Sequence, residues 1–148
     1  MKVKLIASDA SYDALAQELR SHGIEIDNDA PLILQEADAR PEHLICRQGS
    51  ELFRIAVSDM IYIDSLAHDI LVHTSQGIYK AGERLWQLEQ QLSPQAFLRI
   101  SNSVIVARAH IKSIKPALSQ KFLLTLSDGT KVDVTRTYYH AFRDAMGI

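Results

Sequence analysis

The sequence has little of what several classes of protein depend on. A single cysteine, Cys46, excludes an internal disulfide framework and any metal site built from several cysteines, and its apolar neighbours predict a small buried hydrophobe. Aromatic residues make up 7% of the chain, with Trp86 the one tryptophan, so the core must be mainly aliphatic. No apolar run approaches the roughly 18 residues that a membrane helix needs. The first apolar run ends after Ala7, which is not typical of a signal peptide, so we expect a soluble cytoplasmic protein.

The motifs of common enzyme classes are also missing. The sequence has no glycine-rich phosphate loop, no nucleophile elbow and no metalloprotease helix signature. His68 and His73 are the best metal-ligand candidates, but their odd spacing sends them to opposite faces of a strand. Asp64, Ser65 and His68 could suggest a catalytic triad, yet nothing supplies an oxyanion hole. We therefore predict no catalysis, no metal and no cofactor.

The charges that are present are distributed unevenly along the 148 residues. Residues 1–96 hold 8 Lys and Arg against 15 Asp and Glu, whereas residues 97–143 hold 8 basic residues against Asp128 and Asp133. A basic C-terminal third in an otherwise acidic chain is expected where one surface binds an anion. Basic residues that only face water would give the same pattern. Hydrophobic residues at 47% and charged residues at 23% are typical of one globular domain with or without a small appendage.

Residues 1–40 are expected to form a small strand–helix–strand unit. An apolar run at residues 3–7 predicts a strand, and Tyr12, Leu15, Ala16 and Leu19 recur at helical spacing before the stop signal His22-Gly23. Further extended pieces are expected near residues 24–26 and 32–34, and the polar segment 35–41 reads as a linker. This unit has a net charge of −4 and is too short to bury an independent core. It should therefore pack on the rest of the chain or on a second copy.

From residue 43 onward the apolar spacing changes to that of strands. A Gly49-Ser50 turn joins two of them, and Leu85, Leu88 and Leu92 predict one helix that interrupts the series. Asp128-Gly129 suits a type I′ hairpin turn between two alternating segments, and a short helix should end the chain. The expected strands cover residues 44–46, 52–57, 60–63, 70–72, 78–80, 97–100, 104–106, 110–114, 122–126 and 131–134, and the last helix residues 138–146.

The basic third contains a compact polar insertion, Ser101-Asn102-Ser103, between two strand-like segments. Arg99, Asn102 and Arg108 are side chains of the types that donate to phosphates or pair with base edges. A loop that presents them between two strands would suit insertion into a DNA groove. A plain polar turn is the alternative, and these residues alone leave both interpretations open.

Several short segments, taken in order and spacing, resemble the LytTR-type DNA-binding domain over residues 42–148. They are Met60–Ser65 (MIYIDS), Gly77–Tyr79 (GIY), Leu85 to Leu92, Phe97–Ile100 (FLRI), Ser103–Val106 (SVIV), Ile111 to Ile114, Leu124–Gly129 (LTLSDG) and Val132 to Arg136. The resemblance implies a mainly β fold of small antiparallel sheets with one or two short helices. It also implies a bacterial transcription regulator that reads DNA through loops, typically as pairs of molecules on direct repeats.

Carried over by position, the resemblance places DNA contacts in three loops. The implied contact residues are His68, Ser101 with Asn102, and Arg136, and the nearby basic residues Arg99, Arg108 and Lys112 are candidate phosphate contacts. Two positions depart from the family pattern. Ser101 stands where a histidine is common, and Ala107 stands where an asparagine is common. A serine reaches less far toward a base than a histidine does.

The function implied by the resemblance is sequence-specific binding of promoter DNA, by a homodimer on repeated half-sites. Residues 1–40 do not match a receiver domain, so a stand-alone regulator is expected, with residues 41–148 binding DNA and residues 1–40 serving assembly or regulation. The predicted partners are double-stranded DNA, a second copy and, as for some family members, a restraining membrane protein, with no small-molecule substrate. The alternative is a non-catalytic protein-interaction module whose basic face binds an acidic protein.

Overall fold

A computed structural model describes residues 1–37 and 40–148 and divides the chain into two units, Met1–Arg40 and Pro41–Ile148. The expected linker, residues 35–41, contains Asp38 and Ala39, which lie outside the described residues. Within the described ranges, no helix combines the length and the apolar character that crossing a membrane requires. The two units are described separately below.

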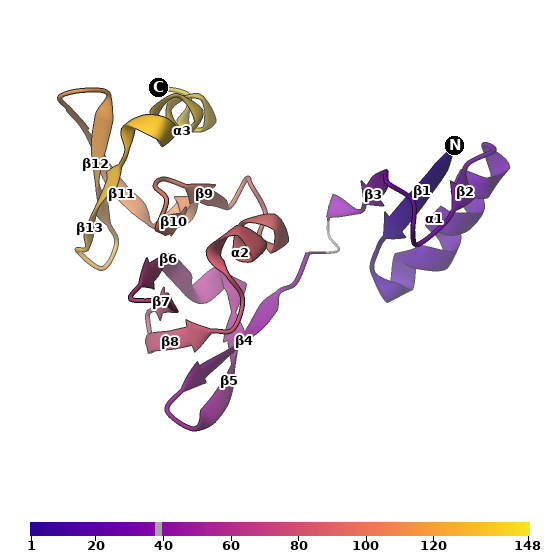
Figure 1. Ribbon diagram of the computed structural model, residues 1–148, viewed down its shortest axis with the longest axis horizontal. Helices are drawn as coiled ribbons and strands as arrows, with labels where there is room; N and C mark the ends of the chain where they lie inside the picture. The colour runs from indigo at the N-terminus through magenta and orange to yellow at the C-terminus, as the bar shows by residue number, and fades with distance from the viewer. Residues whose placement is uncertain (38–39) are drawn as a thin grey trace. The chain divides into compact units, whose positions relative to one another are not determined.

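The N-terminal unit is a three-stranded parallel sheet with one helix, which confirms the predicted strand–helix–strand pattern (Figure 1). Its elements are β1 (Lys2–Ile6), α1 (Asp9–Ser21), β2 (Glu25–Ile26) and β3 (Ile33–Gln35). Both β2 and β3 pair with β1, which gives the order β2-β1-β3. The unit buries few hydrophobic side chains among its described residues, namely Val3, Leu5 and Ala16.

The C-terminal unit is built on a seven-stranded antiparallel sheet. Alternating apolar residues, rich in Ile, Val and Leu, allow each strand to bury one face, as the sequence predicts. The strand order is β5-β4-β8-β7-β6-β10-β9. The strands are β4 (His43–Gln48), β5 (Glu51–Ala56), β6 (Met60–Leu66), β7 (Asp69–Thr74), β8 (Gly77–Ala81), β9 (Phe97–Arg99) and β10 (Val104–Ala107).

A second, three-stranded antiparallel sheet and two short helices complete this unit, so the mainly β fold is confirmed (Figure 1). The sheet has the order β11-β12-β13, and Figure 1 shows it grouped with α3, away from β4 and β5. These elements are α2 (Leu85–Gln91), β11 (Ile111–Ala117), β12 (Lys121–Leu126), β13 (Lys131–Val134) and α3 (Tyr139–Met146).

Two hydrophobic cores lie on the two faces of β10. Ile105 and Ala107 belong to a core that includes Leu85 and Leu88 of α2, and Val106 belongs to the other core. That second core collects the inner side chains of β12 and β13 and Phe142 of α3. Because successive strand residues point to opposite faces, β10 joins the two cores rigidly. The strand therefore gives the loops at its ends a fixed base.

The hairpin at Asp128-Gly129 forms where the sequence predicts it, but its turn type differs. Strands β12 and β13 are joined by four residues, and of this dipeptide only Gly129 takes a positive φ, of 88°. A type I′ turn needs positive φ at both central residues, so that prediction is wrong. The strands pair from Phe122 opposite Val134 to Thr125 opposite Lys131. The connection beyond Thr125 and Lys131 is therefore longer than the two-residue loop of a type I′ hairpin.

Candidate nucleic-acid interface

The turn at residues 100–103 is held from inside by Arg99. Arg99 Nε donates to the Ser101 carbonyl at 2.6 Å, and its Nη2 donates to the Asn102 carbonyl at 2.7 Å. Its Nη1 forms an ion pair with Glu89 Oε2 at 2.7 Å. The side chain is only 15% exposed, and its Cζ lies 5.9 Å from the centre of the Tyr138 ring. The guanidinium fork thus fixes the turn by charge-assisted hydrogen bonds to its backbone.

Ser101 is also engaged within the turn. It is 8% exposed, and its hydroxyl accepts a hydrogen bond from the Ser103 amide at 3.2 Å. The neighbouring Asn102 side chain is exposed, so the turn presents Asn102 to solvent and keeps Ser101 inside. This geometry favours a loop-shaping role for Ser101 and Arg99 in place of the DNA contacts implied for them. The polar-turn and DNA-loop interpretations of this segment are compatible, since the internal bonds shape the loop that exposes Asn102.

Backbone hydrogen bonds join the same turn to the segments that lead to the two other predicted contact residues. The Ser65 amide donates to the Ser103 carbonyl at 2.8 Å, close to the turn that carries His68. On the other side, the Thr135 amide donates to the Ile100 carbonyl at 2.9 Å, next to Arg136. The Tyr138 hydroxyl donates to Asn102 Oδ1 at 3.2 Å, which orients the amide. These bonds fix the 100–103 turn beside the strand that leads to His68 and beside the residue that precedes Arg136.

His68 stands in a strained two-residue hairpin turn between β6 and β7. Leu66 pairs with Asp69, and the residues between them, Ala67 and His68, both have positive φ, of 49° and 71°. That is the type I′ conformation, which usually requires Asn or Gly, and it costs an L-residue roughly 1–2 kcal/mol. His68 is exposed at the tip of the turn. Because Ala and His give no strong turn signal, this turn type is not predictable from the local sequence.

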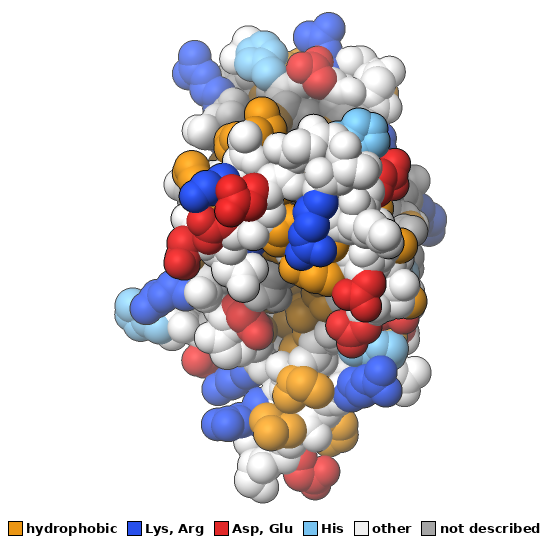
Figure 2. Space-filling view, turned by 90° about the vertical axis from the view of Figure 1, so that its right-hand side faces the viewer, with side chains coloured by type: hydrophobic (Ala, Val, Ile, Leu, Met, Phe, Trp, Pro, Cys, Tyr) orange, Lys and Arg blue, Asp and Glu red, His pale blue; other side chains and the backbone are white. Residues whose placement is uncertain are grey.

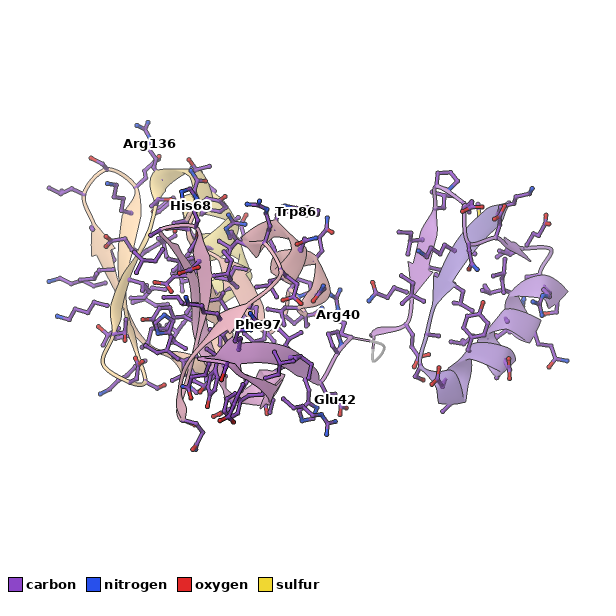
Figure 3. The ribbon with its side chains drawn as sticks, turned by 60° about the horizontal axis from the view of Figure 1, so that its bottom comes forward. Arg40, Glu42, His68, Trp86, Phe97 and Arg136 are labelled. Atoms are coloured by element: carbon purple, nitrogen blue, oxygen red, sulfur yellow. The ribbon has the colours of Figure 1, made fainter. Side chains whose placement is uncertain are left out.

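Arg136 is exposed at the start of the 3₁₀ turn Arg136–Tyr138 that follows β13. In the view of Figure 3 it projects from the surface, and His68 and Trp86 lie toward the same end of the C-terminal unit. Thr135 holds this position by its backbone bond to Ile100. Arg136 therefore combines an open guanidinium with a fixed backbone.

The two remaining basic candidates lie less favourably for DNA contact. Arg108 is partly buried and donates through Nη2 to the Ala145 carbonyl, so it ties the β10 end to α3. Lys112 lies at the end of β11 that pairs with the last residues of β12, whereas Arg136 follows the opposite end of that sheet. Lys121, which pairs with Ala117, stands at the Arg136 end and is exposed. Lys121 is not among the residues predicted from the sequence, because strand register decides which lysines reach that end.

A groove of about 1020 Å³ adjoins this surface, and both His68 and Asn102 line it. Its other lining residues include Arg47 on β4, Arg84 before α2 and Trp86, which is 55% exposed. Neither Arg47 nor Arg84 is ion-paired with a carboxylate in the described part of the chain, whereas Lys80 in the same groove pairs with Asp69 at 3.3 Å. The groove also holds Glu83, which has no ion-pair partner in the described part of the chain, so its carboxylate offsets one of the two arginines.

The residues weighed for catalysis and metal binding are arranged differently from a reactive site. Asp64 is paired with His73 Nε2 at 2.7 Å, not with His68, and His73 stacks on Tyr62 with ring centres 3.9 Å apart. Among residues 1–37 and 40–148, no three His, Cys, Asp or Glu side chains gather as a metal ion would need. Cys46 is buried as predicted, and burial raises the pKa of its thiol to about 11.

Comparison with known proteins finds one matching family and a shared fold. The model of one family, described as "LytTr DNA-binding domain", matches residues 50–147. A solved LytTr DNA-binding domain from Bacillus cereus superimposes with a TM-score of 0.71 at 24% identity, covering 73% of this chain and 99% of that one. This likeness shows that the two share a fold.

The curated relatives are longer proteins. Sensory transduction protein LytT of Bacillus subtilis is 28% identical over 104 residues, which is 70% of this chain and 43% of that protein. Transcriptional regulatory protein LytR of Staphylococcus aureus is 24% identical over 132 residues, or 88% of this chain and 54% of the relative. The chain thus spans about half the length of the curated relatives it matches.

Proposed function

Because the chain belongs to the LytTr DNA-binding domain family, we propose that it is a sequence-specific transcription regulator that reads promoter DNA through three loops of its C-terminal unit. The family match covers 98 of the 148 residues, from 50 to 147, and includes all three loops. The relatives named as regulators, such as the LytR protein, support the regulatory role.

The observation that carries the proposal is the bonding of the 100–103 turn to the strand that leads to His68 and to the residue before Arg136. The 100–103 turn accepts a bond from Ser65 on one side and from Thr135 on the other. Binding sites are most selective when rigid elements hold their side chains, because little ordering is then needed on binding. His68, Asn102 and Arg136 therefore form a prearranged set of side chains that can donate to base edges.

Each of the three side chains has a chemistry that suits base reading. An arginine can donate two parallel bonds to guanine, and an asparagine can pair with adenine, in the major groove. The Tyr138 hydroxyl occupies one position at Asn102 Oδ1, which leaves the amide group of Asn102 to donate. We assign base contacts to His68, Asn102 and Arg136.

Phosphate contacts come from cations beside this surface. Arg47 and Arg84 line the groove next to His68 and Asn102, and Lys121 lies at the Arg136 end of the second sheet. Such contacts position a duplex and supply salt-dependent affinity without selecting sequence. Trp86 in the groove can pack against the sugar backbone, since aromatic side chains offer a flat apolar face.

We expect two copies to bind repeated half-sites, because one unit offers only three base-reading side chains. Two linked modules bind far more tightly than one, as the second binding event becomes intramolecular. The acidic N-terminal unit, with a net charge of −4, would repel a phosphate backbone, which suits a role in assembly or regulation.

Selection of DNA by the purified protein from a random pool tests this proposal. A preferred sequence should emerge, and log affinity for it should fall linearly with log salt, by roughly 0.9 per phosphate neutralised. Trp86, the one tryptophan, should become less accessible to a soluble quencher when DNA binds. A pool that yields no preferred sequence, with equal affinity for all duplexes, would contradict sequence-specific reading and favour the basic face as a site for an acidic protein.

A further inference from the structure

An exposed aliphatic run lies on an edge strand of the N-terminal unit. Leu32, Ile33 and Leu34 are 52%, 61% and 44% exposed, and the order β2-β1-β3 leaves β3 paired on one side only. Hydrophobic side chains also reach the surface among acidic and basic ones on the face shown in Figure 2. Natural proteins protect an edge strand by keeping it very short or by placing a charge or a proline on it. β3, with the sequence Ile-Leu-Gln, is short but carries neither a charge nor a proline.

The other edge of the same sheet is protected. β2 has two residues, one of them Glu25, and Asp27 and Asp29 follow directly. By contrast, no charged residue occurs between Asp29 and Glu36. The Glu36 carboxylate accepts a hydrogen bond from Ser8 Oγ at 3.4 Å, so it is held beside the start of α1. The sheet therefore has one charged edge and one uncharged apolar edge.

The backbone register shows which groups the open edge offers. Lys4 N donates to Leu32 O and Glu36 N donates to Ile6 O, both at 2.8 Å, so the even-numbered residues of this segment bond β1. In a parallel pair, a strand bonds its neighbour through the N–H and C=O groups of every second residue. The N–H and C=O groups of the residues in between point away from that neighbour. The amides and carbonyls of Ile33 and Gln35 thus face outward from the sheet. They are two donors and two acceptors in the pattern that an antiparallel strand can match.

We propose that β3 pairs antiparallel with β3 of a second copy, about a two-fold axis through Leu34. Ile33 of each copy then exchanges two hydrogen bonds with Gln35 of the other, which makes four bonds and a six-stranded sheet. A register centred on Ile33 would bring Gln35 opposite Pro31, which has no amide to donate. The register through Leu34 is therefore favoured.

The strand selects a copy of itself because it is self-complementary. The axis sets Leu34 against Leu34 and places Leu32 against Glu36, so no like charges face each other. Glu25 belongs to β2 at the opposite edge of each sheet and stays apart in the pair. An edge without charge offers nothing to attract a strongly acidic or basic partner. It does offer an apolar surface that a second apolar edge can cover.

Such a contact is small, because each strand contributes three residues. Interfaces well under about 1,200 Å² are typically weak and transient. Two copies on neighbouring half-sites would raise the effective concentration of the strands and allow a weak contact to act. In this role the inference rests on the proposed function, although the pairing itself does not require DNA.

Crosslinking of the full chain tests the pairing without DNA. At the axis, residues in a non-hydrogen-bonded pair have Cα atoms about 4.5 Å apart, within the range that a disulfide spans. Leu34→Cys should therefore form a disulfide dimer under mild oxidation, roughly tenfold or more faster than Ala14→Cys, an exposed position on α1. Both variants retain buried Cys46, so the comparison isolates the new thiol. Equal rates for the two variants would overturn the proposal.

Binding to DNA with one and two copies of a selected site provides the second readout. Leu34→Lys places two like charges at the axis, and Gln35→Pro removes an outward amide while it leaves the bonds to β1. Both should lose cooperativity on the two-site DNA and keep wild-type affinity for one site, whereas Ala14→Lys should change neither. Cooperativity that survives both edge variants would contradict the proposal. A protein that crosslinks through Leu34→Cys but binds no DNA would contradict the proposed function and leave the self-pairing intact.

Discussion

Replacement of Arg99 by lysine tests whether this residue shapes the central loop or contacts DNA itself. The substitution keeps the positive charge but removes the planar fork that holds two carbonyls and Glu89 together. An ammonium can keep the ion pair with Glu89, but its single nitrogen does not replace the three separate nitrogens by which Arg99 reaches Glu89 and both carbonyls. Arg99→Lys should therefore release the turn while it changes the field around it very little.

The size of the effect follows from the two bonds that are lost. Hydrogen bonds to a charged group contribute about 1.5–3 kcal/mol each, and water can replace part of this at the exposed Asn102 carbonyl. We expect the free energy of unfolding to fall by about 2–4 kcal/mol. If the turn positions Asn102 on a base, the loss of that contact costs about 1–3 kcal/mol, or about 5- to 150-fold in Kd.

A double-mutant cycle with Asn102→Ala separates the two roles. When Arg99 acts through Asn102, the double variant should bind the selected DNA no more weakly than the weaker single variant. Urea unfolding and a fluorescence-polarisation titration supply the measurements, and Arg54→Lys, an exposed arginine on β5, is the matched control. Additive losses of affinity would refute the reasoning, since they would mean that Arg99 makes a separate contact. Wild-type stability in Arg99→Lys would refute it as well.

Three further results are expected. Arg136→Ala should cost about 1–3 kcal/mol on selected DNA and little on random duplex, whereas Lys121→Ala should weaken both alike and lower the salt slope by roughly 0.9 in a binding titration. Ala67→Gly and His68→Gly should each raise the free energy of unfolding in urea by about 1 kcal/mol by relieving the left-handed turn, but only His68→Gly should weaken selective DNA binding. Because burial raises the pKa of the Cys46 thiol to about 11 from its ordinary 9, the stability due to this group is present below pH 9 and is lost as pH rises through 11. Alkylation of Cys46 at pH 8 should accordingly be roughly 100-fold slower in the native protein than in urea, and equal rates would exclude a buried neutral thiol.

Local sequence signals predicted most of the strands and helices correctly. The spacing of Leu85, Leu88 and Leu92 predicted α2, and Gly49-Ser50 predicted the turn between β4 and β5, because both signals act within a few residues. The order of such segments carried the family resemblance, which the comparison with known proteins confirmed. Helices and strands of this kind can be predicted because the spacing of their apolar residues is visible directly in the sequence.

Long-range partners could not be predicted in the same way. Arg99 and Arg108 look like available cations in the sequence, yet one binds Glu89 and the turn backbone, and the other binds the Ala145 carbonyl 37 residues away. Which lysine reaches the Arg136 end of the second sheet depends on the register of β11 and β12. A charge count establishes that a basic segment exists, but only packing decides which cations remain free.

The two hairpin turns show why the candidate site departs from the local rules. Asp128-Gly129 joins β12 and β13 with a glycine at the left-handed position, so this turn carries little strain. The turn at Ala67 and His68 places two L-residues in the same region of φ, although glycine or asparagine would fit at lower cost. Glycine at 68 would relieve that strain but would remove the imidazole from the tip beside the groove. Backbone strain that persists at an exposed position, next to a surface of convergent polar side chains, favours a functional reason for the residue that bears it. For His68, this strain is an argument for a functional role that does not depend on its place in the family pattern.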